Sequence, residues 1–412
     1  MYDVCVIGLG YVGLPTAALF AAAGERVFGV DTNKDLLTAL DKGSWKSSEA
    51  DLRELVRTVV SKKFLTVGEK PVLAKAFIIC VPTPERDGEA DLTALDNAVR
   101  AVAETIKQTA AELVVIESTV PPHTAENHVC PIFKEFGVDP GRDFHLAYCP
   151  ERVLPGNTIH EITQNHRTIG GLTKECGQAA AALYRRISSG PISATSILTA
   201  ELSKLVENSY RLVNVALANE VFDMCVRHGA LPEAVISAAN CHPRVHLLRP
   251  GAGVGGHCIP VDPHFLSPAE GSLIARSLYL SQMRPMQIAM KIMEATETGD
   301  KIALLGLTYK ANTDDCRNSP AKEVLRIMAS HVREVTVFDP HAARPTDAPE
   351  WRENLQDAAE QAALVVVLVD HSKFRSLNPQ EMAELVAGKK VFDVAGALNR
   401  ISWKACGFQF IL

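Results

Sequence analysis

A cysteine in a glycine-rich loop is the first residue of this sequence that suggests chemistry. Cys258 follows glycines at 253, 255 and 256 and stands four residues before Asp262. Glycines let a backbone approach a ligand closely, and a thiol becomes a nucleophile where a nearby cation favours the thiolate. Composition alone favours an inert core cysteine, because free cysteines are usually buried. The segment 255–263 is therefore a candidate nucleophile loop whose cation must come from elsewhere.

A candidate cation lies upstream on a long helical pattern. Lys204, Asn208 and Arg211 are spaced i, i+4 and i+7, so they share one face of a helix. Spacing alone favours a solvated face. If the face lines a polar site instead, an ammonium and an amide would stabilise negative charge developing on oxygen.

A dinucleotide-binding motif opens the chain. GLGYVG at 8–13 follows an apolar strand pattern and begins a small-residue helix. Gly8 permits the tight turn, Gly10 lets a pyrophosphate approach, and Gly13 lets helix and strand pack closely. Asp31 ends the next strand, where an acid accepts hydrogen bonds from ribose hydroxyls and repels a 2′-phosphate. The pattern predicts NAD rather than NADP.

Two later turns carry threonines at strand ends. Thr83 lies in VPTP at 81–84 and Thr119 in ESTVPP at 117–122. Ligands of an open α/β sheet sit beyond the carboxyl ends of its strands, which makes both threonines candidates for ribose or nicotinamide contacts. Ordinary turn and cap chemistry is an equal alternative.

The elements that position these residues form an α/β pattern. Near-continuous apolar runs between helical segments predict parallel sheets covered on both faces. Strands are expected at 4–7, 26–30, 77–81, 114–116, 145–148, 302–307, 335–338, 365–369 and 391–394. Helices are expected at 12–23, 92–109, 174–187, 198–227 and 272–297, the last interrupted by Pro285.

This pattern predicts two Rossmann-like, doubly wound domains joined by a long-helix central domain that forms the dimer contact. The expected boundaries are 1–188 for NAD binding, 189–297 for the helical centre with the cysteine loop, and 298–412 for the second α/β domain. That last domain lacks a G-x-G-x-x-G motif, which fits a nucleotide held without a second dinucleotide.

Composition excludes several classes of protein. The chain has 412 residues, 47% hydrophobic and 22% charged, with a formal net charge of −6. No basic run suggests nucleic-acid binding, and no apolar run reaches the roughly 18–20 residues of a membrane span. The ten cysteines form no C-x-x-C pair, so we expect free thiols, no metal and a cytoplasmic location.

Five stretches together carry a family resemblance. They are VIGLGYVGLP at 6–15, EST at 117–119, the helix with Lys204 and Asn208, GGHC at 255–258 and DDCRNSP at 314–320. Nearly the whole chain thereby resembles the nucleotide-sugar 6-dehydrogenases, the UDP-glucose/GDP-mannose dehydrogenase family. CPERVLPG at 149–156, HPRV at 242–245 and PGAGVGGHCI at 250–259 resemble the members that oxidise UDP-N-acetyl-D-mannosamine. Ala252 departs from the proline expected in this loop, which bears on the rigidity of the loop rather than on its chemistry.

The resemblance implies oxidation of a sugar C6 alcohol to a carboxylate with NAD, through a thiohemiacetal on the cysteine. Implied catalytic residues are Cys258, Lys204, Asn208, Asp262, Glu151 and Thr119. Implied cofactor contacts are Gly8, Gly10, Tyr11, Val12, Gly13, Asp31, Thr83, Thr119 and Arg317. Implied substrate contacts are Glu151, Arg152, Val153, Lys204, Asn208, Arg211, His242, Arg244, Gly255, Tyr309 and Lys310.

The expected partners are a UDP-N-acetylhexosamine and a second copy of the chain, whose Arg244 is implied to reach a neighbouring subunit's site. Three alternatives stay open. The sugar is UDP-N-acetylglucosamine or UDP-glucose; the enzyme is a two-electron 3-hydroxyacid-type dehydrogenase, which needs no cysteine; or the protein is a non-catalytic sensor of NAD or nucleotide sugars.

Overall fold

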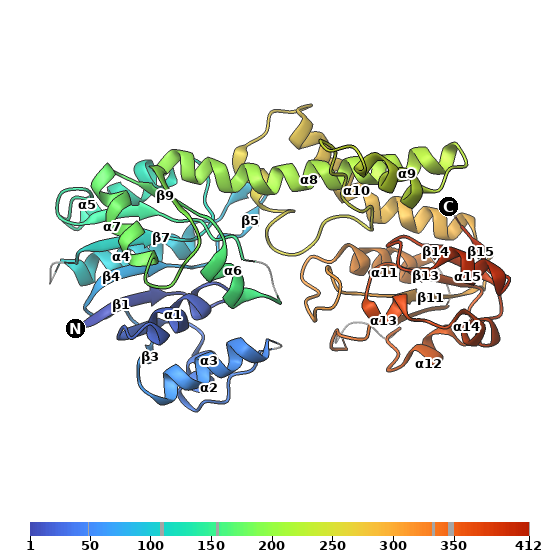
Figure 1. The fold of residues 1–412 in the computed structure, drawn as a ribbon, viewed down its shortest axis with the longest axis horizontal. Helices are drawn as coiled ribbons and strands as arrows, with labels where there is room; N and C mark the ends of the chain where they lie inside the picture. Colours follow the sequence, from blue (N-terminus) through green and yellow to red (C-terminus); the bar gives the residue numbers. More distant parts are fainter. Residues whose placement is uncertain (48, 108–110, 154–155, 332–333, 345–349, 412) are drawn as a thin grey trace. The chain divides into compact units, whose positions relative to one another are not determined.

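The computed structural model describes residues 1–412 except 48, 108–110, 154–155, 332–333, 345–349 and 412. The expected end of one helix at 108–109 and two residues of the CPERVLPG stretch, 154–155, therefore lie outside the described residues. The chain divides into two compact units (Figure 1): Met1–Glu207 with His264–Ser267, and Asn208–Pro263 with Pro268–Leu412. Each unit is built around its own β-sheet.

The described strands of the first unit form an eight-stranded sheet in the order β10-β9-β8-β7-β4-β1-β2-β3. Neighbouring strands are parallel except β8 and β9, which pair antiparallel and so depart from the expected all-parallel sheet. The strands are β1 Tyr2–Ile7, β2 Val27–Val30, β3 Leu65–Gly68, β4 Ala74–Ile79, β7 Leu113–Ile116, β8 His145–Tyr148, β9 Arg167–Gly171 and β10 Ile192–Ser196. A separate hairpin pairs β5 Glu85–Arg86 with β6 Glu89–Ala90.

Helices cover both faces of this sheet because successive strand residues point to opposite sides. Val4 and Val6 lie in one apolar core with α1, α2, α3, α6 and α7, while Cys5 and Ile7 lie in the other with α4 and α5. The helices are α1 Gly13–Ala22, α2 Lys34–Asp41, α3 Ala50–Ser61, α4 Thr93–Ile106, the π-helix η1 Ala125–Val129, α5 Cys130–Glu135, α6 Thr158–Gln164 and α7 Lys174–Tyr184.

The long helix α8 spans Ile197–Arg227 and runs from the first unit into the second. It is followed by α9 Pro232–Asn240, the 3-10 helix η2 Asp262–Leu266 and α10 Leu273–Glu294. The expected interruption at Pro285 is wrong, because α10 continues through it. A proline cannot donate to the carbonyl of Ser281, but α10 buries Ile288 and Ile292 in the core of the second unit, and this packing outweighs the missing bond.

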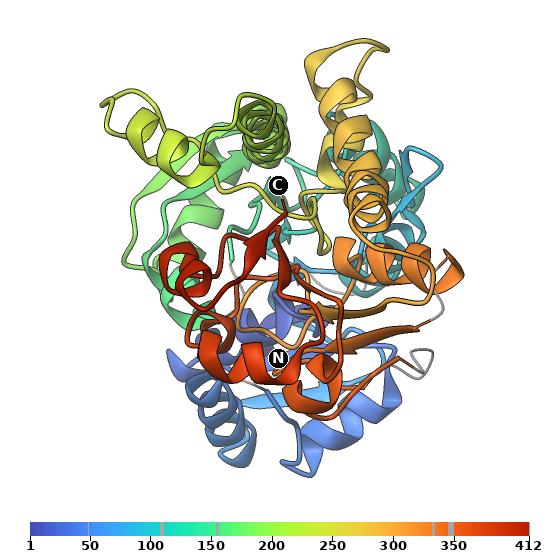
Figure 2. The ribbon, with the colours of Figure 1, turned by 90° about the vertical axis from the view of Figure 1, so that its right-hand side faces the viewer.

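The described strands of the second unit form a five-stranded parallel sheet in the order β12-β11-β13-β14-β15. They are β11 Lys301–Leu305, β12 Glu334–Phe338, β13 Leu364–Val367, β14 Lys390–Asp393 and β15 Gln409–Phe410. Ile302 and Leu304 lie in one apolar core with α10 and α11, whereas Ala303 and Leu305 lie in another with α12 to α15. Figure 2 turns the C-terminal strands and helices of this unit, in orange and red, toward the viewer. The helices are α11 Pro320–His331, α12 Leu355–Ala359, α13 Ser372–Arg375, α14 Pro379–Leu385 and α15 Arg400–Ala405.

The expected α/β class with two Rossmann-like sheets and a long intervening helix is confirmed. Each expected strand is present, with ends shifted by up to three residues. Among the described residues, no helix is long and apolar enough to cross a membrane.

Candidate active site

The glycine turn after β1 fits a dinucleotide. A Cβ on Gly8 would stand 2.5 Å from the carbonyl oxygen of Cys80, and one on Gly13 would stand 1.8 Å from that of Gly8, so neither position has room for a side chain. At Gly10, no atom of the described residues lies within 4 Å of the same point, so the backbone is open there. The N-terminus of α1 faces this turn and carries no acidic residue in its first turn. Its N–H groups suit the pyrophosphate of NAD.

Asp31 follows β2 and supports the same turn. Its Oδ2 accepts a hydrogen bond from the backbone N–H of Leu9 at 2.8 Å, and its Oδ1 accepts one from that of Asn33 at 2.8 Å. The carboxylate is half-buried, and its remaining lone pairs suit ribose hydroxyls. Tyr11 in the turn is 39% exposed, and its hydroxyl lies 2.8 Å from Oγ1 of Thr158. Val12 is half-buried and precedes α1 directly.

The two threonine turns come together. Oγ1 of Thr83 donates to the carbonyl of Thr119 at 2.5 Å, and Oγ of Ser118 donates to the carbonyl of Val81 at 2.7 Å. Thr83 is buried and Thr119 is half-buried. The turns after β4 and β7 therefore form one bonded rim at the carboxyl edge of the sheet, where a nicotinamide-binding site is expected.

Lys204 is buried and does not lie on a solvated face. It is 5% exposed, and its Nζ donates to the carbonyl of Glu151 at 2.8 Å and to Oε1 of Glu151 at 3.2 Å. The other carboxylate oxygen of Glu151 accepts the N–H of Val153 at 2.6 Å. A buried ammonium needs such compensation. Glu151, in the turn after β8, and Lys204, in the first part of α8, therefore form an ion pair.

The cysteine loop is fixed to α8 one turn beyond Lys204. Asn208 and Asp262 are 6% and 3% exposed, and Nδ2 of Asn208 donates to Oδ2 of Asp262 at 2.5 Å. The backbone N–H of Asp262 donates to the carbonyl of Cys258 at 2.8 Å, and Cys258 is half-buried. Arg211, next on the same stripe, is exposed. The stripe is therefore buried at Lys204 and Asn208 and exposed only at its end.

The other side of the loop packs on the turn after β11. A Cβ on Gly255 would lie 2.7 Å from Cβ of Tyr309, and one on Gly256 would lie 2.8 Å from the Tyr309 ring. Nδ2 of Asn318 donates to the carbonyl of Gly256 at 3.1 Å. Burial and nearby charges, those of Asp315 and Cys258 among them, raise the pKa of Tyr309. The loop is thus held by α8 on one side and by Tyr309 on the other.

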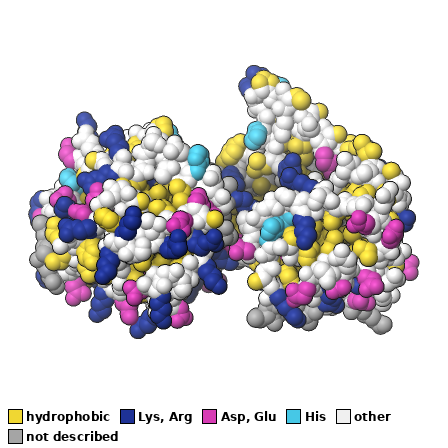
Figure 3. Space-filling model, turned by 60° about the horizontal axis from the view of Figure 1, so that its bottom comes forward, with side chains coloured by type: hydrophobic (Ala, Val, Ile, Leu, Met, Phe, Trp, Pro, Cys, Tyr) yellow, Lys and Arg dark blue, Asp and Glu magenta, His cyan; other side chains and the backbone are white. Residues whose placement is uncertain are grey.

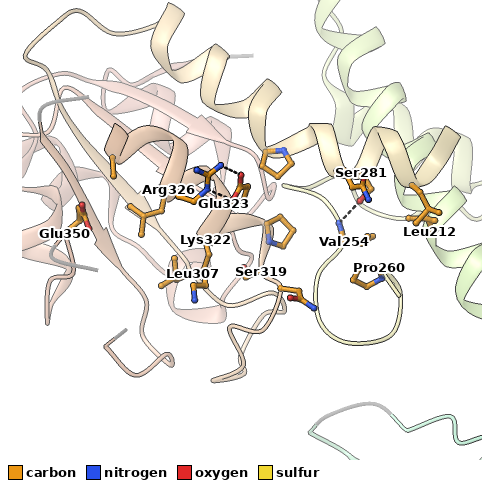
Figure 4. A pocket seen from close by; sticks show the side chains of 17 residues that line it. Leu212, Val254, Pro260, Ser281, Leu307, Ser319, Lys322, Glu323, Arg326 and Glu350 are labelled. Carbon is orange, nitrogen blue, oxygen red and sulfur yellow. Dashed lines mark hydrogen bonds and ion pairs between the residues drawn. The ribbon is translucent and has the colours of Figure 1, made fainter. Parts of the chain in front are cut away.

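A cavity of about 670 Å³ adjoins this loop within the second unit (Figure 4). It lies against Val254 and Pro260 of the loop and against residues of α10 and α11. The N–H of Val254 donates to Oγ of Ser281 at 3.2 Å, which ties the loop to α10. Arg326 and Glu323 at its wall pair with each other at 2.6 Å.

Two arginines that the resemblance implies as ligand contacts, Arg152 for the substrate and Arg317 for the cofactor, already bond other residues. Arg152 spends its guanidinium donors inside the first unit, on Glu207, Thr168 and the carbonyl of His166. Arg317 is paired with Asp315 at 2.6 Å.

The remaining expected substrate contacts belong to the second unit. His242 and Arg244 are exposed there, and Lys310 is half-buried in the turn after β11. Basic and acidic side chains are interspersed over the face drawn in Figure 3. With a net charge of −6, an anionic ligand has to be held by local groups such as these.

Sequence reasoning missed Glu201. It is fully buried on α8, three residues before Lys204, and it accepts the N–H groups of His123 at 2.7 Å and Ala125 at 2.9 Å. Burial outweighs these bonds and raises the pKa of Glu201 to about 7. The residue anchors the start of η1, just beyond Thr119. Its place on the stripe 201, 204 and 208 is the signal that could have found it.

A second missed group lies under the same rim. The Glu117 carboxylate, 2% exposed, accepts the hydroxyl of Tyr184 at 2.5 Å and the thiol of Cys80 at 3.0 Å. Arg167 lies 3.7 Å away, yet burial outweighs it and raises the pKa of Glu117. Glu117 directly precedes Ser118 and Thr119, so this cluster fixes the base of the threonine turn.

Comparison with known proteins follows this geometry. The NAD-binding, central and UDP-binding domains of the UDP-glucose/GDP-mannose dehydrogenase family match residues 2–188, 198–287 and 303–400. A Methanocaldococcus jannaschii protein named UDP-N-acetyl-D-mannosamine dehydrogenase is 38% identical, over 98% of this chain and 95% of that protein. A Ralstonia solanacearum protein named NDP-N-acetyl-D-galactosaminuronic acid dehydrogenase is 39% identical, over 93% and 94%. The structure of a UDP-D-ManNAc dehydrogenase from Pyrococcus horikoshii matches with a TM-score of 0.92 at 36% identity, over 99% and 98% of the two chains.

Proposed function

This chain belongs to the UDP-glucose/GDP-mannose dehydrogenase family of NAD-dependent nucleotide-sugar dehydrogenases, and on that premise we propose that it oxidises C6 of a UDP-N-acetylhexosamine to the carboxylate. The proposed substrate is UDP-N-acetyl-D-mannosamine, the substrate in the names of several relatives. The product would be UDP-N-acetyl-D-mannosaminuronate.

One observation carries this proposal. The half-buried Cys258 sits in a loop that Asp262 fixes to Asn208, and Lys204 lies one helical turn before Asn208 on α8. A thiol, an amide donor and an ammonium are the groups that covalent oxidation of an aldehyde needs.

The proposed chemistry runs through the thiol. The C6 hydroxyl gives its proton to the acid–base set of Lys204, Asp262 and Glu151, and C6 loses a hydride to become an aldehyde. The Cys258 thiolate then adds to that carbon, and its oxygen takes a proton, which gives a thiohemiacetal. Loss of a second hydride and of the hydroxyl proton gives a thioester. Water displaces the thiolate and leaves the carboxylate and two protons.

The chain's own residues make this series of reaction steps possible. NAD⁺ supplies the hydride acceptor, once for each oxidation, and we assign its pyrophosphate to the turn at Gly10, its ribose to Asp31 and its nicotinamide end to the Thr83–Thr119 rim. Covalent capture by Cys258 keeps the aldehyde on the protein while one cofactor leaves and the next binds. Lys204 and Asn208 stabilise the oxyanion that each carbonyl step creates.

Replacement of the nucleophile tests the proposal. We expect Cys258→Ser to stall after the first oxidation or to accumulate a covalent ester, with net NADH release nearly abolished. Mass spectrometry of the protein distinguishes the two results. Substrate should also protect Cys258 selectively from iodoacetamide among the ten cysteines of the chain. Wild-type turnover by the serine variant would remove Cys258 as the nucleophile.

A substrate panel separates the remaining sugars. UDP-N-acetylmannosamine, UDP-N-acetylglucosamine and UDP-glucose are each incubated with NAD⁺, and products are identified by mass spectrometry and NMR. The relative named for a galactosaminuronic acid keeps the choice of sugar within the test. Two NADH per sugar supports four-electron oxidation, one NADH indicates a two-electron dehydrogenase, and none with any sugar indicates a sensor.

We also propose a homodimer built on the second unit. Tyr210, Leu217 and Met224 are 59%, 44% and 42% exposed at seven-residue spacing on α8, and α10 exposes a similar stripe at Tyr279, Met283, Met286 and Met290. Exposed apolar stripes of this kind usually mark an interface.

The proposed functional division of the chain is 1–188 for NAD binding, 189–297 for the helical centre with the cysteine loop, and 298–412 for the nucleotide-sugar domain. We further propose a reducing compartment such as the cytoplasm, because the cysteines are thiols rather than disulfides.

A further inference from the structure

The turn after β11 repeats the backbone plan of the dinucleotide turn after β1. A glycine with positive φ follows each strand, Gly8 at 89° and Gly306 at 98°. The next N–H, of Leu9 or Leu307, donates to an aspartate that follows the neighbouring parallel strand, Asp31 at 2.8 Å and Asp339 at 2.6 Å. Asp339 therefore occupies the position of the ribose-binding acid.

The two acids differ in what surrounds them. Asp31 is half-buried, whereas the side chain of Asp339 is fully buried. Besides Leu307, the Asp339 carboxylate accepts the N–H groups of Thr308 at 3.1 Å, His341 at 2.8 Å and Ala342 at 3.0 Å. Its Oδ2 also lies 3.0 Å from Nε2 of His371, which is itself fully buried. Burial and these bonds leave Asp339 no access to a ribose.

The hydrogen bonds of His371 determine its tautomer. The backbone N–H of Asn312 points at Nδ1 from 2.9 Å, and because an N–H can only donate, Nδ1 carries the lone pair. The proton is therefore on Nε2, which donates to Asp339. The ring thus joins the acid to the end of the turn, and Asn312 is tied in turn to Ser372, next to His371, by two side-chain bonds of 3.0 Å.

The turn 307–312, which these bonds of Asp339 and His371 hold, carries Tyr309. The side chain of Tyr309 supports the nucleophile loop 255–263. That side chain fills the space beside Gly255 and Gly256, within 2.7 Å and 2.8 Å of where their Cβ atoms would stand. A shift of the turn would therefore be passed directly to the loop that carries Cys258. Burial raises the pKa of Asp339, but the bonds from His371 and the backbone hold it well below its ordinary value, so the turn is closed around a charged carboxylate.

We propose that His371 is a positioning residue for the nucleophile. Together with Asp339 it closes what would be a second ribose site and locks the turn 307–312, so that Tyr309 holds the Cys258 loop and Lys310 is presented to the diphosphate of the nucleotide sugar. This inference rests on the proposed function for the role of Cys258 and goes beyond it in naming the group that places the loop.

Two substitutions separate the two bonds of the ring. His371→Gln keeps a donor near the position of Nε2 and so keeps the bond to Asp339. His371→Asn keeps an acceptor near Nδ1 for Asn312 but leaves the buried carboxylate one donor short. His331→Gln, on the end of α11, is the matched control for loss of a histidine in the same unit.

The readouts use the full chain and do not require turnover. They are the rate of Cys258 alkylation by iodoacetamide, read by peptide mapping, the dissociation constant of UDP by calorimetry, and that of NADH by fluorescence. We expect His371→Asn to change the alkylation rate of Cys258 about tenfold and to raise the dissociation constant of UDP about tenfold. The dissociation constant of NADH should stay within about twofold of the wild-type value. His371→Gln should lie closer to wild type, and His331→Gln should match it. A folded His371→Asn variant with wild-type alkylation and UDP binding overturns the proposal.

A measurement on the unaltered protein covers the case in which the asparagine variant does not fold. The ¹⁵N shifts of His371 should report the Nε2–H tautomer, and an Nδ1–H or doubly protonated ring overturns the proposed bonding. If wild type itself neither binds UDP nor shows selective alkylation of Cys258, the proposed function fails. If wild type does both and the His371→Asn variant does not differ, the positioning role alone fails.

Discussion

Replacing Gly255 with alanine should displace the nucleophile loop. The new Cβ would stand 2.7 Å from Cβ of Tyr309, 2.8 Å from the carbonyl oxygen of Asn318 and 2.8 Å from Cδ of Pro320. These neighbours are a backbone atom, a proline ring and the first atom of a packed side chain. None of them can move aside by a simple side-chain rotation. Overpacking of this kind costs about 1–3 kcal/mol.

The expected changes in thermal stability and turnover follow from that cost. At about 2–4 °C per kcal/mol for a unit of this size, the thermal midpoint should fall by about 2–12 °C. A loop displaced by about 1 Å should also lower turnover about a hundredfold. NADH affinity should not change, because the dinucleotide turn belongs to the first unit.

Gly251→Ala is the matched control in the same segment. A Cβ there meets no atom of the described residues within 4 Å, so stability and turnover should be unchanged or slightly raised. Both variants are compared by differential scanning fluorimetry and by NADH release at saturating substrate. If Gly255→Ala behaves like Gly251→Ala, the argument that Tyr309 and Asn318 fix the loop is wrong.

Three further changes test the buried acids and the cofactor turn. Burial raises the pKa of Glu201 from 4.5 to about 7, so the folded protein keeps a proton that the unfolded chain loses between these values, and stability falls as pH rises through that window. Glu201→Gln should abolish this loss of about 3 kcal/mol, measured by urea unfolding at about pH 5 and about pH 8. Tyr184→Phe removes the hydroxyl donor of buried Glu117 and should cost about 1–3 kcal/mol of unfolding free energy. Tyr2→Phe, whose hydroxyl bonds a partly buried threonine, should cost less, and equal losses would contradict this. Asp31→Asn should weaken NAD binding. It should also lower the ratio of kcat/KM with NAD to kcat/KM with NADP by about tenfold. An unchanged ratio would show that Asp31 does not select the cofactor.

Local patterns were sufficient for the strongly apolar elements. The strand β7 and the helix α8 were predictable because one is a continuous apolar run and the other is some thirty residues without glycine or proline. The strands β3, β9 and β10 were not recognised. The sequence of β9 is RTIGG, whose paired glycines are typical of a turn, and β10 carries no fully buried residue. Their strand state comes from pairing in the sheet, as does the antiparallel join of β8 and β9.

The amino-acid sequence by itself determined the dinucleotide turn, the α/β rhythm and the family, because glycine requirements, apolar periodicity and motif spacing are properties of neighbouring residues. Tertiary structure alone decided which polar groups are buried and what each one bonds. Lys204 meets Glu151 across 53 positions, Asn208 meets Asp262 across 54, and His371 meets Asp339 across 32. Burial of a charge or an amide is compensated only by a partner that packing brings to it, and packing depends on the whole chain rather than on any local stretch.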